Sequence, residues 1–169
     1  MLNEYTRFLY SCTSVSAGFT GLLFVALSIV NRDESHEVRR ERRTLLAASA
    51  FLLLVDVLFV SLFSSLGGSK TFATVSLGMA VLGLLATSRL LPRAKRAGNY
   101  ARGFEKRTLN LAFTAVTLAS YSAQFGLAVA LLADPRNASL VRALIFLLAA
   151  LIVNALGRAW EVAGIVHRT

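Results

Sequence analysis

The residues of this chain whose types could do chemistry lie inside long apolar stretches. Asp56 is the thirteenth of 23 residues in the stretch 44–66 and the only charged residue within it. A carboxylate near the centre of a bilayer costs about 2.5–3.5 kcal/mol on insertion scales, so it should face the interior of a helical bundle. Two hypotheses follow: Asp56 binds a proton or cation on a pathway, or it is a hydrogen-bonded group that holds helices in register.

Other polar side chains at a similar depth are the predicted partners of Asp56. Tyr121 and Gln124 lie near the middle of a later apolar stretch, and Thr20 lies in the first one. Phenol, amide and hydroxyl groups can all hydrogen-bond to a carboxyl group. Tyr121 and Gln124 therefore join Asp56 as predicted residues of an ion or proton pathway.

The first apolar stretch is rich in hydroxyl groups, and Thr13, Ser16 and Thr20 would share one face of a helix. One interpretation is that these hydroxyls bond to the carbonyl group four residues earlier and allow close packing. The alternative is that the face lines a wet vestibule or pore, which would add all three residues to the pathway.

A polar ladder of Asn154, Arg158 and Glu161 lies near the end of the last apolar stretch. Arg158 and Glu161 are three residues apart and can pair on a helix. Arg158 can also extend to the membrane interface beside Trp160, a residue type enriched at the headgroup level. The ladder is interpreted as a membrane anchor, with an inner gate or a lipid-headgroup contact as the alternative.

Sequence motifs of soluble catalysis are missing from the chain. It contains no GxGxxG, Walker A, HExxH or CxxC pattern. Its single cysteine, Cys12, cannot form an internal disulfide, and His36 and His167 are far apart in the sequence. We therefore expect no enzyme activity, no cofactor and no metal site.

The elements that must position the polar residues are membrane-spanning helices. Hydrophobic residues make up 56% of the 169 residues and charged residues 16%, against about 25% charged in an average soluble domain. A helical span needs about 20 mostly apolar residues, and continuous apolar stretches favour helices over a barrel. The sequence predicts one all-α domain with five spans, at 8–30, 44–66, 71–91, 109–133 and 140–160.

Short connections predict which of these spans are neighbours. The segments 67–70 and 134–137 are rich in Gly, Ser, Asp, Asn and Pro, residue types that form tight turns between antiparallel helices. Pro92 is predicted to end the third span, because proline lacks the N–H group that continues a helix.

The charge distribution predicts the orientation in the membrane. The net charge is +9, and 14 of the 18 Lys and Arg residues lie in the loops 31–43 and 89–107 or near the C-terminus. Positively charged loops stay in the cytoplasm, so the N-terminus should be outside and the C-terminus cytoplasmic. Nucleic-acid binding is not expected, because no folded element remains to present the basic residues.

The two basic loops predict contacts with anionic lipid headgroups. Loop 31–43 mixes acids with arginines, which suits a solvated helical extension or a surface for a protein partner. Loop 89–107 has apolar residues at helical spacing, namely Ala97, Tyr100, Ala101 and Phe104. Two interpretations follow: the loop is only the positively charged signal that sets the orientation, or it forms a short interfacial helix.

Small residues repeat every three or four positions in several spans, a pattern that lets membrane helices approach closely. One such stripe is centred on Ala80 in the third span, and another on Ser122 in the fourth. We expect at least one of them to lie between the subunits of a homo-oligomer.

Two short segments, 21–28 (GLLFVALS) and 158–161 (RAWE), resemble small bacterial multi-pass membrane proteins of unassigned function. The resemblance implies a location in the bacterial inner (plasma) membrane. It implies no activity and no site residue.

Together these features predict a small oligomeric channel or transporter for an ion or proton that uses a carboxylate at the membrane midplane. Two alternatives stay open. One is a non-transporting accessory or scaffold subunit bound to another membrane protein. The other is a membrane-perturbing effector controlled by a cytosolic partner.

The orientation gives the first testable prediction. Single cysteines in the loops 31–43 and 89–107 should resist a membrane-impermeant thiol reagent in intact cells, in a background with Cys12 replaced. Cysteines at Lys70 and Asn137 should be labelled from outside. Labelling of the 89–107 loop in intact cells would reverse the predicted orientation.

Overall fold

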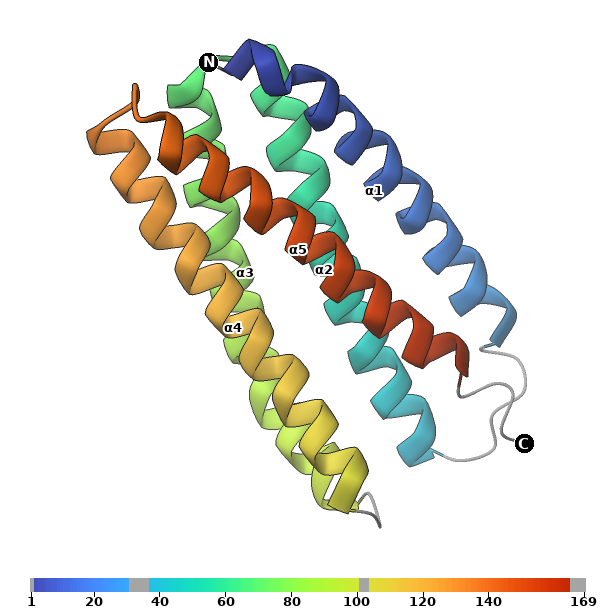
Figure 1. Cartoon of the computed structure of the whole chain (residues 1–169). Helices are drawn as coiled ribbons and strands as arrows, with labels where there is room; N and C mark the ends of the chain where they lie inside the picture. The colour runs from blue at the N-terminus through green and yellow to red at the C-terminus, as the bar shows by residue number, and fades with distance from the viewer. Residues whose placement is uncertain (1, 31–36, 101–103, 165–169) are drawn as a thin grey trace.

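The computed structural model describes residues 2–30, 37–100 and 104–164, and this part of the chain is entirely helical apart from short turns. Figure 1 shows the helices packed side by side in alternating directions. The all-α prediction is therefore confirmed. The helices are α1 (Leu2–Val30), α2 (Glu37–Leu66), α3 (Ser69–Tyr100), α4 (Phe104–Ala133) and α5 (Ala138–Gly164).

All five helices are long and apolar enough to cross a membrane. Their apolar segments have 20 to 23 residues, and a helix of that length spans the roughly 30 Å hydrocarbon core. The chain is therefore a multi-pass membrane protein by length and composition. The segments agree closely with the predicted spans and are Tyr5–Val25, Thr44–Leu66, Ser69–Arg89, Thr114–Ala133 and Ala138–Trp160.

Both predicted tight turns are present. Between α2 and α3, a Cβ atom added at Gly67 would collide with Thr71, so the turn needs a glycine there. Between α4 and α5, the side chain of Asn137 caps α5, because its Oδ1 accepts a hydrogen bond of 3.1 Å from the backbone N–H of Ser139. In Figure 1 the two turns lie at the same end of the bundle as the start of α1.

The prediction that Pro92 ends the third helix is wrong. The helix α3 continues through Pro92 to Tyr100, and α4 begins at Phe104. A proline removes one backbone hydrogen bond but leaves the remaining bonds of a long helix in place. Of the two interpretations of the 89–107 loop, a separate interfacial helix is not seen in the described residues, since 97–100 extend α3 and Phe104 starts α4. The expected helical extension of the 31–43 loop is present from Glu37 onward, whereas 31–36 lie outside the described residues.

The helix α2 is the centre of the bundle and packs against α1, α3 and α5. The helix α4 packs against α3 and α5, and α1 packs mainly on α2. The apolar core lies around α2, where Leu53, Leu54, Val57 and Val60 are at most 1% exposed. Of the five spans, α2 is the most buried and α1 the least.

The two stripes of small residues have different environments. On α3 the whole stripe is buried within the protomer, so the stripe centred on Ala80 does not lie between subunits. Its members are Ala73, Ser76, Ala80, Gly83 and Thr87. On α4 the stripe centred on Ser122 is mostly exposed. The exposed members of the α4 stripe are Ala115, Ala119, Ser122 and Gly126.

Gly83 explains why the α3 stripe must be small. A Cβ atom at this position would collide with the ring of Tyr121 on α4. At Gly126, by contrast, an added Cβ atom would meet nothing within 4 Å. Close contact of α3 with α4 therefore depends on the missing side chain at Gly83.

These two glycines give a matched pair of variants. Gly83→Leu should destabilise the bundle by about 1–3 kcal/mol, because it forces Tyr121 or the backbone to move. Gly126→Leu should leave the melting temperature of the protomer in detergent unchanged or slightly higher. Equal melting temperatures for Gly83→Leu and the unmodified protein would contradict the packing described here.

Candidate functional site

The candidate site is a group of buried polar side chains in the interior of the bundle, centred on Asp56. Asp56 on α2 is 0% exposed, and Gln124 on α4 donates a hydrogen bond of 3.0 Å from its Nε2 to Asp56 Oδ1. Asp56 therefore faces the interior and meets one of its predicted partners.

The amide group of Gln124 joins three helices. Its Nε2 donates both to Asp56 Oδ1 on α2 and, at 3.3 Å, to the backbone carbonyl of Ser76 on α3. A side-chain NH₂ group has two hydrogens, so both of its donors are used. The amide is thereby held between α2 and α3, and its Oε1 has no hydrogen-bond partner among the described residues.

Two further polar residues lie on the same face of α4 as Gln124. Tyr121 and Thr117 precede Gln124 by three and seven residues, a spacing that aligns side chains along one side of a helix. Thr117 Oγ1 accepts hydrogen bonds from two α5 residues, from Arg158 Nη2 and, at 3.4 Å, from Asn154 Nδ2. A polar column thus runs from Asp56 to Arg158.

Tyr121 lies between the acidic and the basic end of this column. Its phenol is 1% exposed and interacts electrostatically with both Asp56 and Arg158. Its hydroxyl group has no hydrogen-bond partner in the described part of the protein, so the expected Tyr121–Asp56 hydrogen bond is not formed. Tyr121 therefore separates the two charged residues without bridging them.

Several buried polar atoms of the site have no hydrogen-bond partner among the described residues. Buried polar atoms in proteins are nearly always hydrogen-bonded, and leaving one unpaired costs about 1–3 kcal/mol. Four such atoms are oxygens, which can accept hydrogen bonds or coordinate cations. The set comprises Asp56 Oδ2, Gln124 Oε1, Tyr121 OH and Ser76 Oγ.

The hydroxyl-rich face of α1 is separate from this site. Thr13 Oγ1 donates to the carbonyl of Leu9 at 3.0 Å and lies 2.8 Å from Ser61 Oγ on α2. The predicted back-bonding and close packing are thus seen at Thr13. At Thr13 this face of α1 therefore packs against α2.

Ser16 and Thr20 differ from Thr13 because their hydroxyl oxygens are buried without a hydrogen-bond partner in the described chain. The expected hydrogen bond from Thr20 to Asp56 is therefore wrong. Its physical reason is the helix geometry: Ser61, which marks the α1-facing side of α2, is about 140° around the helix axis from Asp56.

The inner polar ladder is only partly as expected. Arg158 is 4% exposed and points into the bundle toward Thr117, so the expected extension to the membrane interface is wrong. Trp160 is 80% exposed at the end of the α5 span, where an aromatic anchor is expected. The side chain of Glu161 lies outside the described residues, and its pairing with Arg158 stays a prediction.

Sequence reasoning missed two contributors to the site, Ser76 and Thr117. Ser76 was visible only as a small residue of the α3 stripe, although its carbonyl contacts Gln124. Thr117 could have been found from its spacing to Tyr121 and Gln124. In the described chain, no cluster of three His, Cys, Asp or Glu residues could hold a metal ion.

No protein-family model matches the chain, and no curated protein or solved structure is detectably similar to it. The resemblance to small bacterial membrane proteins accordingly stays a prediction.

The bond between Gln124 and Asp56 gives a testable prediction on stability. Gln124→Leu should cost about 1–3 kcal/mol, because it leaves a buried carboxyl group and a buried carbonyl without their donor. The double variant Asp56→Leu with Gln124→Leu should recover part of that loss, which a double-mutant cycle of thermal unfolding in detergent measures.

Ser122→Leu, at an exposed position of the same helix, is the matched control and should leave the melting temperature unchanged. Strictly additive effects of the Asp56 and Gln124 substitutions would contradict the interaction.

Proposed function

We propose that the protein is a small membrane transporter that moves a proton or a small cation through the interior of the five-helix bundle. Asp56 is its binding residue. The observation that supports this proposal is the buried carboxyl group with one unpartnered oxygen, among further buried polar atoms without partners. A group with only a structural role would be expected to have its hydrogen bonds completed by its neighbours.

The polar column supports access to Asp56 from one side. From Gln124 to Thr117 the helix rises about 10 Å, roughly a third of the hydrocarbon core. Asn154 and Arg158 continue the polar surface to the end of the α5 span. With the N-terminus outside, this is the cytoplasmic side.

The opposite side of Asp56 is closed by apolar side chains. Val60 lies one helical turn beyond Asp56, Phe72 lies one turn beyond Ser76, and both are 0% exposed. Such a layer excludes hydrated ions. We therefore propose gated, transporter-like passage in place of a permanently open pore.

The exposed α4 stripe favours a second candidate function. Small residues are typical of contacts between membrane helices, and this stripe is left free by the protomer. It would suit a homo-oligomer of the transporter, or docking of a non-transporting accessory subunit to another membrane protein. The proposed location in the bacterial inner membrane is compatible with both functions.

The transport proposal is tested by flux into vesicles that contain the purified protein and a pH-sensitive dye. Asp56→Asn keeps the size of the side chain but removes its charge and its proton exchange. Proton or cation flux should therefore fall at least about tenfold, a change worth about 1.4 kcal/mol in the barrier. The melting temperature should change little.

Asp134→Asn is the matched control, because Asp134 is an exposed acid in the α4–α5 turn and should not affect flux. Unchanged flux in a folded Asp56→Asn variant would remove Asp56 from transport. Flux of the unmodified protein no higher than that of empty vesicles would favour the accessory-subunit function.

A further inference from the structure

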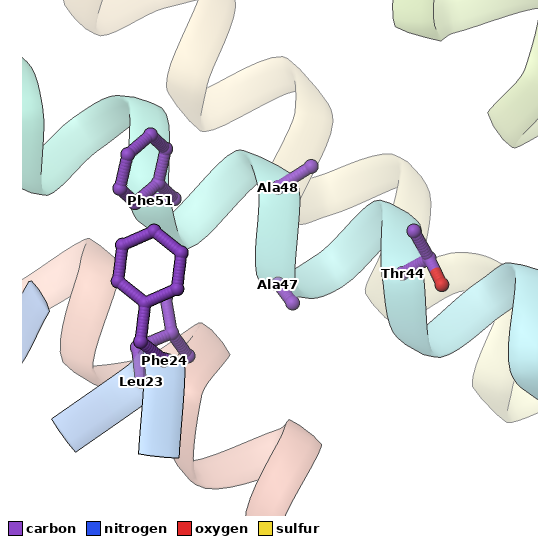
Figure 2. Close-up of a pocket in the computed structure, with 6 residues that line it drawn as sticks. All are labelled: Leu23, Phe24, Thr44, Ala47, Ala48 and Phe51. Carbon is purple, nitrogen blue, oxygen red and sulfur yellow. The ribbon is translucent and has the colours of Figure 1, made fainter. Parts of the chain in front are cut away.

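A pocket of about 230 Å³ lies between α1 and α2, on the side of Asp56 that is nearer the start of α2. It is larger than the engineered apolar cavity of about 150 Å³ that accommodates benzene in a well-studied protein. Figure 2 shows the side chains that surround it, with the aromatic rings of Phe24 and Phe51 next to each other. Its lining residues are Leu23 and Phe24 of α1 with Thr44, Ala47, Ala48 and Phe51 of α2.

The side chains that line the pocket are suited to contact with a hydrocarbon chain. All lining side chains except Thr44 are apolar, and the rings of Phe24 and Phe51 form one wall in an edge-to-face contact with centroids 5.3 Å apart. Leu23 and Ala47 are buried, whereas Phe24 is 56% exposed and Thr44 is also exposed. The pocket is therefore open toward the surroundings of the bundle, which at this depth are lipid.

The position of the pocket along α2 places it in one leaflet. Thr44 is the first residue of the apolar segment of α2, and Phe51 lies about 10 Å deeper along the helix axis. This depth corresponds to the upper part of an acyl chain, close to its headgroup. A chain in the pocket would thus have its phosphate near the start of α2.

The start of α2 carries a positive charge at that level. Between Glu37 and Thr44 the helix has four arginines and two glutamates, a net charge of +2. Arginine is the side chain best suited to bind phosphate, because its donors form a fixed fork. The charge favours anionic over zwitterionic headgroups.

We propose that the pocket between α1 and α2 binds one acyl chain of an anionic phospholipid, whose headgroup lies at the arginine-rich start of α2. The bound lipid fills the gap between the two helices in the leaflet next to the 31–43 loop. It thereby stabilises the contact of α1, the least buried span, with the rest of the bundle. This site is independent of the transport function.

The unmodified protein supplies the first test. Delipidated protein is titrated in detergent with phosphatidylglycerol or phosphatidylcholine of identical chains, and bound lipids are counted by native mass spectrometry. One saturable phosphatidylglycerol site should appear, with binding roughly thirtyfold tighter than that of phosphatidylcholine, as two net positive charges near the headgroup would give. Equal binding of the two lipids would overturn the proposal.

A phosphatidylglycerol with a photoreactive acyl chain tests the location. Cross-links should map to the segments 19–30 and 44–52. Cross-links confined to other helices, or a second copy of the chain cross-linked at this face, would overturn the proposal.

Two substitutions separate chain from headgroup. Ala48→Phe fills the pocket with an apolar ring and should weaken phosphatidylglycerol binding roughly tenfold, a loss of about 1.4 kcal/mol. Ala17→Phe, at an exposed position of α1 outside the pocket, should not. A variant with Gln in place of the four arginines at the start of α2 should bind phosphatidylglycerol only as tightly as it binds phosphatidylcholine. The replaced residues are Arg39, Arg40, Arg42 and Arg43.

Lipid binding is compared only between variants whose melting temperatures equal that of the unmodified protein. If Ala48→Phe does not fold, Thr44→Phe at the exposed mouth of the pocket takes its place. Full phosphatidylglycerol binding by a folded pocket-filling variant would overturn the proposal.

Discussion

A carboxyl group at the centre of a bilayer needs a hydrogen-bond donor from another helix, and in this protein Gln124 supplies it to Asp56. The same amide binds a carbonyl of α3, so one side chain of α4 fixes its position against two helices. Because lipid tails are as apolar as leucine, such polar contacts and close packing, rather than hydrophobicity, hold the spans together. The geometry of α2, α3 and α4 therefore depends on this one amide.

The interior of the bundle differs on the two sides of Asp56. On one side, polar groups of α4 and α5 lead to Arg158, and on the other Val60 and Phe72 fill the space. This asymmetry is the reason for proposing a transporter that opens alternately to two sides in place of a pore. Opening the apolar side would require α2 and α3 to move apart near their connecting turn, which contains Gly67 and Gly68.

Much of the fold could be predicted from the sequence, because a bilayer leaves few choices to a long apolar stretch. The five spans and both tight turns follow from residue type alone. The extent of α3 does not, since a proline lowers helix stability without forbidding the helix beyond it. The pairing of Asp56 with Gln124 was predicted from depth. The burial of Arg158 and the separation of Thr20 from Asp56 depend on helix rotation, which hydrophobic patterns specify weakly when all sides of a helix are apolar.

The contact of Gly83 with Tyr121 has a consequence for how this sequence can evolve. A larger residue at position 83 would force the ring of Tyr121 or the backbone to move, and loss of that ring would relieve the collision, so the two sites should change together among descendants of this chain. Loss of the ring would also remove the group that separates Asp56 from Arg158. Selection to keep Tyr121 in the interior of the bundle should therefore also keep a glycine at position 83 of α3.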